Sequence, residues 1–222
     1  MSVTVDLWLW RLDRQTPAGC LSEDEEARAG RYVHARDRMA FRAARAGLRR
    51  VLGLVMDRDP ACLTFRQDAA GKPFLPGGPS FNLSHSGDWA LLGVTPAHPL
   101  GVDLEAHRPV ETAVARRFFS PAEQAALRRL PITDWPTGFF RLWTRKEAVV
   151  KALGTGLSHP LDSFDVTLTE IAALNRMEGG DPRDWTLADL PLGPRMAGAV
   201  AMIGAGAPVE LRLREGAMPL PD

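Results

Sequence analysis

The 222-residue sequence predicts a mixed α/β fold of the α+β kind, in which helices alternate with short strands. Two observations predict it. Segments with apolar residues at helical spacing alternate with short apolar runs that read as strands. The two halves also share one order of helix, loop and β-hairpin, since DWALLGVTPAHPLGVDLE in the middle resembles RMAGAVAMIGAGAPVELRL near the end in rhythm. This likeness indicates an internal duplication.

In the first half, the start and stop signals of helices are clear. Ser22 and Glu25 form a capping box that starts the first helix. Gly53 is expected to end the second helix. Gly and Pro between the helices and the hairpin indicate loops around short strands. The predicted elements are a strand at 3–10, helices at 23–30 and 37–52, short strands within 60–80, and strands at 89–94 and 100–104.

In the second half, Ser120, Pro121 and Glu123 combine a capping residue, a proline at the first helical position and a capping glutamate. Gly154 is expected to close the longest helix of this half. The predicted elements are helices at 120–130 and 137–153, and strands at 164–168, 195–203 and 209–214.

Composition and charge exclude several classes of protein. Lys+Arg and Asp+Glu each number 27, so the formal net charge is zero, which argues against a bulk nucleic-acid-binding protein. The N-terminal MSVTVDLWLWRLD does not resemble a signal peptide, and no run of about 18 apolar residues occurs. We therefore expect no membrane or nucleic-acid partner and a cytoplasmic location.

Asp103 and Glu105, in the segment GVDLE, form the first candidate site. In a strand these two positions point to the same face. Neighbouring carboxylates repel each other unless they are neutralised, and a hard divalent cation such as Mg²⁺ does this beside phosphates. A solvated strand end with two exposed acids explains the spacing equally well.

Glu147 and Lys151, in WTRKEAVVKALGTGL, form the second candidate site. With Trp143 they are spaced four residues apart, so all three share one helix face. A surface ion pair worth ~0.3–0.5 kcal/mol is the simpler interpretation. The tryptophan on this face favours burial instead. Glu147 is then a candidate metal carboxylate, and Lys151 a candidate partner of a phosphate or leaving group.

Ser84 and His85 lie in FNLSHSG, where a serine hydrolase is disfavoured because the Gly-x-Ser-x-Gly elbow is missing. A histidine between two hydroxyls suits phosphate oxygens, and an ordinary turn is the alternative. Lys72, before Pro73, offers a point charge to a phosphate. Arg45 and Arg49 on the second helix would add to an anion pocket, although a solvated helix face explains them more simply.

Together these segments resemble the 4′-phosphopantetheinyl transferases, specifically the surfactin-synthetase type. The resemblance covers most of the chain: a helix with Arg45 and Arg49, then GKP, FNLSHSGDWALLGV, GVDLE, RRFFSPAE and LWTRKEAVVKALGTGL. It implies two similar halves related by a pseudo-twofold axis, each a small antiparallel sheet packed with a long helix. We place the halves at residues 1–108 and 109–222, with the ligands in the cleft between them.

The resemblance also implies a reaction. Coenzyme A would donate its 4′-phosphopantetheine to a serine hydroxyl of an apo acyl or peptidyl carrier protein, releasing adenosine 3′,5′-bisphosphate. The catalytic residues would be Asp103, Glu147 and Lys151, and either Glu147 or a metal-held water would be the base. The implied ligands of Mg²⁺, or of Mn²⁺ as its alternative, are Asp103, Glu105 and Glu147. The implied coenzyme-binding residues are Arg45, Lys72, Pro73, Ser84, His85 and Lys151. The basic stretch before the second helix is also implied to meet the 3′-phosphate, and which of its arginines does so stays open: Arg28, Arg31, Arg36 or Arg38.

Two other functions stay open. A Mg²⁺-dependent pyrophosphate hydrolase acting on coenzyme A-like substrates would use the same carboxylates. A non-catalytic coenzyme A-binding protein would be expected to lack an acid or Lys151, and all are present. We expect a monomer, because both halves lie in one chain. A basic-apolar cluster could form a docking edge for the carrier, and it consists of Arg116, Arg117, Phe118 and Phe119. The alternative is that the two phenylalanines belong to the core, where this residue type usually lies.

Overall fold

The computed structural model describes residues 3–13, 19–96, 98–156, 159–204 and 209–215. Leu157, in the last predicted motif, lies outside the described residues. In chain order the elements are β1 (Val3–Arg11), α1 (Glu23–Gly30), α2 (Ala35–Met56), β2 (Arg66–Gln67), β3 (Pro73–Phe74), β4 (Ser80–Ser86), β5 (Trp89–Thr95), β6 (Leu100–Ala106), α3 (Thr112–Phe118), α4 (Pro121–Arg128), α5 (Trp135–Leu153), β7 (Phe164–Val166), β8 (Leu174–Met177), β9 (Trp185–Asp189), β10 (Met196–Ile203) and β11 (Val209–Glu215).

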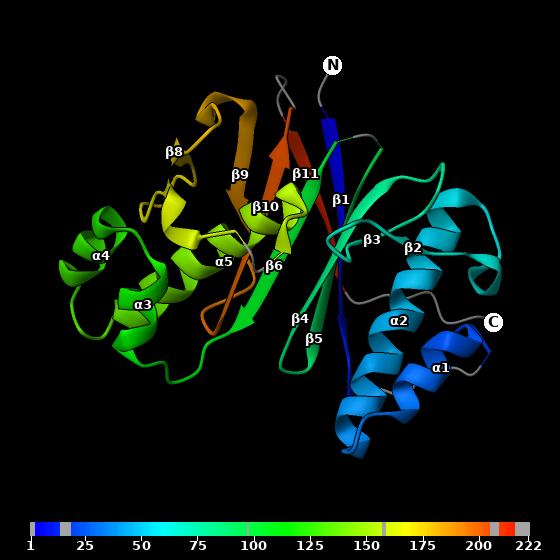
Figure 1. Ribbon diagram of the computed structural model, residues 1–222. Coiled ribbons are helices and arrows are strands. Elements are labelled where there is room, and N and C mark those ends of the chain that lie inside the picture. The colour runs from blue at the N-terminus through cyan, green and yellow to red at the C-terminus, as the bar shows by residue number, and fades with distance from the viewer. Residues whose placement is uncertain (1–2, 14–18, 97, 157–158, 205–208, 216–222) are drawn as a thin grey trace.

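Two sheets form the centre of the molecule (Figure 1). The four-stranded sheet has the order β11-β1-β5-β4, and the three-stranded sheet has the order β6-β10-β9. Two short ladders, β2–β3 and β7–β8, lie outside them. The mixed α/β prediction is confirmed, with one correction: β11 runs parallel to β1, so the larger sheet is not wholly antiparallel.

Strands cross between the two halves in both directions. β6 leaves β5 and pairs with β10, while β11 leaves β10 and pairs with β1. The two predicted hairpins are therefore wrong, because the strands of each pair belong to different sheets. The pattern of apolar residues shows that two strands follow each other in the sequence, but it does not show which strand each of them pairs with. The boundary at 108/109 stays a prediction.

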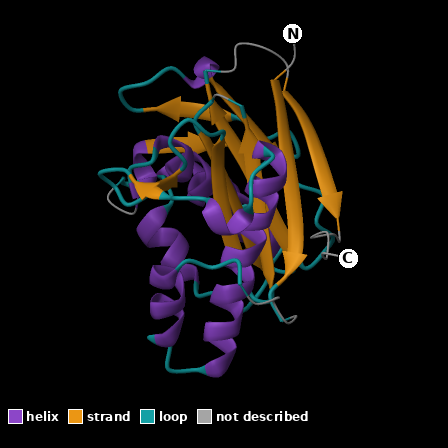
Figure 2. Cartoon of the chain, turned by 90° about the vertical axis from the view of Figure 1, so that its right-hand side faces the viewer, coloured by secondary structure: helices purple, strands orange, loops and turns teal. Residues whose placement is uncertain are grey.

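Each sheet is covered on both faces. The helix α2 packs on the four-stranded sheet through a core that includes Trp10, Leu48 and Leu92. The helix α5 packs on the three-stranded sheet through a core that includes Phe140, Val149 and Ala199. The opposite faces share a third cluster, formed by alternate residues of β1, β5, β6 and β10. Figure 1 accordingly shows α2 and α5 on opposite sides of the strands, and Figure 2 views the molecule from the α2 side. The prediction of a long helix on each sheet is confirmed.

The helix signals were correct, except for one stop. Both capping boxes form, at Ser22 and at Ser120, and Gly154 closes α5 with φ 71°. Gly53 does not end α2, which continues to Met56 and is capped by Asp57 at φ 50°. The glycine is needed inside the helix, because a Cβ there would overlap the Arg58 carbonyl. The prediction did not include α3, β4, β8 or β9, and the segment FNLSHSG belongs to β4 rather than to an ordinary turn.

Among the described residues, no helix is long and apolar enough to cross a membrane.

Candidate active site

The strand β6 brings two acids beneath α5. Leu100, Val102 and Leu104 point into the core between the sheets, so Asp103 and Glu105 point to the α5 side. Gly101 makes this possible, because a Cβ there would collide with the backbone of α5 at Ala148. The glycine of GVDLE therefore lets the helix approach closely enough for its side chains to reach the acids.

Lys151 on α5 joins the helix to β6. Its ammonium lies 2.6 Å from Asp103 Oδ1 and donates to Ser84 Oγ at 3.0 Å. Asp103 is only 4% exposed. The predicted surface pair between Glu147 and Lys151 is thus replaced by a part-buried pair between Lys151 and Asp103, because the neighbouring strand competes successfully for the ammonium.

β4 reaches β6 through side chains rather than through backbone pairing. Asn82 Oδ1, Ser84 Oγ and Ser86 Oγ accept hydrogen bonds from three successive alternate amides of β6, at Val102, Leu104 and Ala106. These bonds satisfy amides of β6 that no sheet partner takes. The polar residues of NLSHS are therefore structural as well as chemical.

The same serines also hold the acids of β6. Ser84 Oγ donates to Asp103 Oδ1 at 2.9 Å, and Ser86 Oγ donates to Glu105 Oε2 at 2.6 Å. The hydroxyl protons are thereby committed to carboxylates. The prediction that both hydroxyls face phosphate oxygens receives no support from this geometry.

A pocket of about 340 Å³ opens where β4, β6 and α5 meet. Six of the predicted site residues line it together with three others. The lining residues are Leu83, Ser84, His85, Asp103, Leu104, Glu105, Trp143, Glu147 and Lys151. Residues separated by up to 68 positions in the sequence thus converge on one cavity of mixed charge.

Burial disfavours the ionised form of two acids in this pocket, Asp103 and Glu147. Burial raises the pKa of Asp103, although Lys151 and Ser84 oppose the rise. Burial also raises the pKa of Glu147, and repulsion from Asp103 and Glu105 adds to the effect. For His85, desolvation lowers the pKa, and Lys151 lowers it further. The ionised acids would be stabilised by an added positive charge, as in many active sites.

The donor set fits a hard divalent cation. Asp103 Oδ2 is buried and has no hydrogen-bond partner among the described residues. Carboxylate oxygens are ligands that Mg²⁺ prefers, and the pocket holds three carboxylates, of which Asp103 has the oxygen without a partner. In the arrangement described, no three acidic, histidine or cysteine side chains already lie at metal-binding distances within those residues. Lys151 and Arg108 are the cations that contact Asp103 and Glu105.

Three predicted coenzyme-binding residues lie outside this pocket. Lys72 donates from its ammonium to the carbonyls of Leu100, at 2.9 Å, and Lys151, at 2.6 Å. It joins the end of α5 to β6, and its burial lowers its pKa. Pro73 forms the short strand β3. These contacts give Lys72 a structural role, and its contact with a phosphate stays a prediction.

Arg45 and Arg49 do not form a solvated helix face, so that interpretation is wrong, whereas the contact of Arg45 with coenzyme A stays a prediction. Arg45 Nε donates to Glu25 Oε1 at 2.6 Å, and Arg49 Nε donates to Glu25 Oε2 at 2.5 Å. Arg49 is 2% exposed and also donates to two carbonyls. Burial raises the pKa of Glu25, but Arg45, the Ser22 amide and Arg49 more than offset this and lower it overall. The anion these arginines bind comes from α1.

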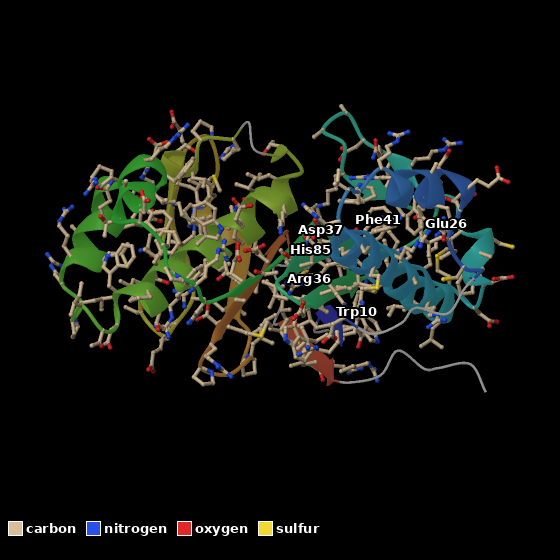
Figure 3. The ribbon with its side chains drawn as sticks, turned by 90° about the horizontal axis from the view of Figure 1, so that it is seen from below. Trp10, Glu26, Arg36, Asp37, Phe41 and His85 are labelled. Atoms are coloured by element: carbon tan, nitrogen blue, oxygen red, sulfur yellow. The ribbon has the colours of Figure 1, made fainter. Side chains whose placement is uncertain are left out.

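Two further basic residues have acidic partners near the pocket: Arg36, one of the four arginines expected near the 3′-phosphate, and Arg108, which the sequence analysis did not assign. Arg108 pairs with Glu105. Arg36, at the start of α2, donates to Asp88 in the turn after β4 at 2.8 Å. Figure 3 shows Arg36 and Asp37 on the same side of the molecule as His85. Composition gave no signal for them, because arginine is frequent throughout the chain.

The family models match both halves of the chain. The model described as the 4′-phosphopantetheinyl transferase superfamily matches residues 99–201, and the one described as 4′-phosphopantetheinyl transferase, N-terminal, matches residues 11–97. The 4′-phosphopantetheinyl transferase HetI of Nostoc sp. is 37% identical over 220 residues, which are 93% of this chain and 90% of HetI.

The chain belongs to the 4′-phosphopantetheinyl transferase superfamily.

Two relatives from Bacillus subtilis agree with this assignment. One 4′-phosphopantetheinyl transferase is 33% identical over 72% of this chain and 75% of its own length. The 4′-phosphopantetheinyl transferase Sfp is 33% identical over 67% of this chain and 66% of its own length. The predicted family, of the surfactin-synthetase type, is confirmed, and the protein is an enzyme of the transferase class.

Proposed function

We propose that this transferase moves the 4′-phosphopantetheine of coenzyme A to a serine hydroxyl of an apo carrier protein, in a Mg²⁺-dependent reaction that releases adenosine 3′,5′-bisphosphate. The observation that carries the proposal is the buried, unpartnered Oδ2 of Asp103, in a pocket shared with Glu105, Glu147 and Lys151. A pyrophosphate carries the negative charge that this lysine can balance, and a divalent cation can neutralise the acids.

The proposed bond changes balance. The serine oxygen forms a bond to the phosphorus that carries the pantetheine. The bond from this phosphorus to the bridging oxygen breaks, and that oxygen leaves with adenosine 3′,5′-bisphosphate. The serine proton passes to a base, and a proton or positive charge is needed on the leaving phosphate.

The chain's own residues suit these roles. Lys151 places an ammonium beside Asp103, where it can donate to the leaving phosphate. Glu147 lies in the same pocket, where its carboxylate could accept the serine proton directly or through a metal-held water. Mg²⁺, held by Asp103, Glu105 and Glu147, would supply charge neutralisation at the pyrophosphate.

The coenzyme's other phosphate needs a separate cation. Arg36 is a better candidate than Arg45, because its ion pair with Asp88 is exposed, with the arginine side chain 75% exposed, whereas the Arg45 side chain is 17% exposed in its pair with Glu25. His85 lines the pocket and lies three residues before Asp88, the partner of Arg36. We therefore propose Arg36 and His85 as contacts of the 3′-phosphate.

The carrier would approach the side of α3. Arg116 and Arg117 are exposed there, while Phe119 is 2% exposed and Phe118 packs edge-on against Trp143 at 5.8 Å between ring centroids. The phenylalanines thus pack as the core prediction required. The arginines leave a basic edge next to a pocket residue, which suits an acidic partner. We propose that the enzyme acts as a monomer.

Intact-protein mass spectrometry tests the function. The enzyme is incubated with coenzyme A, Mg²⁺ and a panel of apo carrier proteins. We expect one carrier to gain the mass of one phosphopantetheine, and Glu147→Gln to abolish the gain. The exposed Glu178→Gln is the matched control and should retain full activity. Cleavage of coenzyme A without a modified carrier would replace transfer by hydrolysis, and intact coenzyme A with every carrier would refute the proposal.

A further inference from the structure

Glu105 is contacted from two sides. Ser86 Oγ donates to its Oε2 at 2.6 Å, and Arg108 Nη1 donates to the same oxygen at 2.6 Å. Arg108 Nη2 approaches Oε1 at 3.5 Å, so the guanidinium covers both oxygens. An acid proposed to bind a metal is therefore covered by a cation of the chain itself.

The cations paired with the two acids of β6 differ in how exposed they are. The Lys151 side chain is 26% exposed, and its partner Asp103 is nearly buried. The Arg108 side chain is 57% exposed, although Glu105 beside it is 16% exposed. Ion pairs with an exposed partner are weak, because water and salt screen them. Arg108 can therefore leave its carboxylate at a smaller cost than Lys151.

The loop after β6 keeps Arg108 at the pocket when its ion pair breaks. Its guanidinium lies 5.4 Å from the ring centroid of Phe140, and the ring of His107 stacks on the same phenylalanine at 5.0 Å. His107 is also tied to Arg195 by a backbone hydrogen bond. The arginine can then turn away from Glu105 without displacement of the backbone.

We propose that Arg108 is a positioning residue that competes with the divalent cation for Glu105. This inference rests on the metal site of the proposed function. The competition weakens binding of the metal alone. When the pyrophosphate arrives with the metal, it supplies further oxygen ligands and an alternative anionic partner for the guanidinium. Arg108 thereby makes metal binding depend on coenzyme A.

Binding of Mn²⁺, measured by electron paramagnetic resonance, tests the competition without any turnover. We expect Arg108→Gln to bind Mn²⁺ about two- to fivefold more tightly than the wild type in the absence of coenzyme A, in line with the small strength of an exposed ion pair. Addition of coenzyme A should tighten Mn²⁺ binding more in the wild type than in the variant.

Arg117→Gln is the matched control. Arg117 is also exposed and lies over a phenylalanine, Phe118, at 5.2 Å from the ring centroid. Arg117→Gln removes the same charge as Arg108→Gln. An equal gain in Mn²⁺ affinity in both variants would therefore show an effect of net charge alone and overturn the inference. Unchanged thermal unfolding would show that both variants are folded.

The results separate the two proposals. If the wild type binds no Mn²⁺, or if Glu147→Gln binds it equally well, the proposed metal site fails. If the wild type binds Mn²⁺ and Glu147→Gln weakens it, the metal site stands. In that case unchanged or weaker binding by Arg108→Gln would overturn the competition alone.

Discussion

Replacing Lys146 by methionine should destabilise the fold strongly, although this residue precedes Glu147 in the same motif. The Lys146 side chain is fully buried, and its ammonium lies 2.6 Å from Glu123 Oε1 and 2.7 Å from the Phe164 carbonyl. Glu123 is itself 3% exposed. The pair connects α5 to α4 and β7.

The magnitude follows from what methionine leaves behind. Glu123 would keep the backbone amides of Ser120 and Val166 as donors but lose its ammonium partner. Removing one partner of a buried ion pair costs about 3–5 kcal/mol, whereas replacing both partners by neutral groups costs far less. We therefore expect Lys146→Met to lower the free energy of unfolding by about 3–5 kcal/mol at pH 7, and Lys146→Met with Glu123→Gln to recover most of this loss.

Acid should reduce the defect of the single variant. Burial already raises the pKa of Glu123, and the loss of Lys146 raises it further. A carboxyl whose folded pKa exceeds its unfolded pKa loses stability as the pH rises through the folded value. The variant should therefore approach the wild type as the pH falls toward the ordinary value for glutamate.

Urea unfolding followed by tryptophan fluorescence measures the change by linear extrapolation. Arg128→Met, on the exposed side of α4, is the control and should change the free energy of unfolding by less than about 0.5 kcal/mol. A loss below about 1 kcal/mol for Lys146→Met would refute the reasoning. So would a double variant as unstable as the single one.

Three further predictions concern the pocket. Gly101→Ala should destabilise the fold by about 1–3 kcal/mol and slow transfer at least tenfold, because the new Cβ meets the backbone of α5 at Ala148; unchanged urea unfolding would contradict this. Glu147→Gln should abolish transfer but raise the free energy of unfolding by about 0.5–2 kcal/mol at pH 8. The reason is that the pKa of Glu147 is raised by burial, so its ionisation opposes folding above the ordinary glutamate pKa. Equal stability of variant and wild type at pH 8 would contradict this. Lys72→Met should cost about 1–3 kcal/mol, because two carbonyls lose a charged donor. A loss below about 0.5 kcal/mol would contradict this, and a tenfold rise in KM for coenzyme A would support the phosphate contact predicted for this lysine.

The sequence determined the parts of the site that depend on local geometry. Alternation in a strand placed Asp103 and Glu105 on one face, and spacing by four placed Glu147 and Lys151 on one face of α5. Capping residues located the helix ends at Ser22 and Ser120 because their hydrogen bonds span only three residues. The family resemblance then brought these separate faces together in one proposed site.

Only the tertiary structure decided which partner each charged side chain contacts. Arg45 pairs with Glu25 of α1, Lys72 donates to two backbone carbonyls, and Arg108 pairs with Glu105. In the same way, β6 pairs with β10 and not with β5, the strand before it in the sequence. Residue spacing specifies which side chains share a face of one element. It does not specify which element covers that face, because burial and pairing between distant segments decide this together.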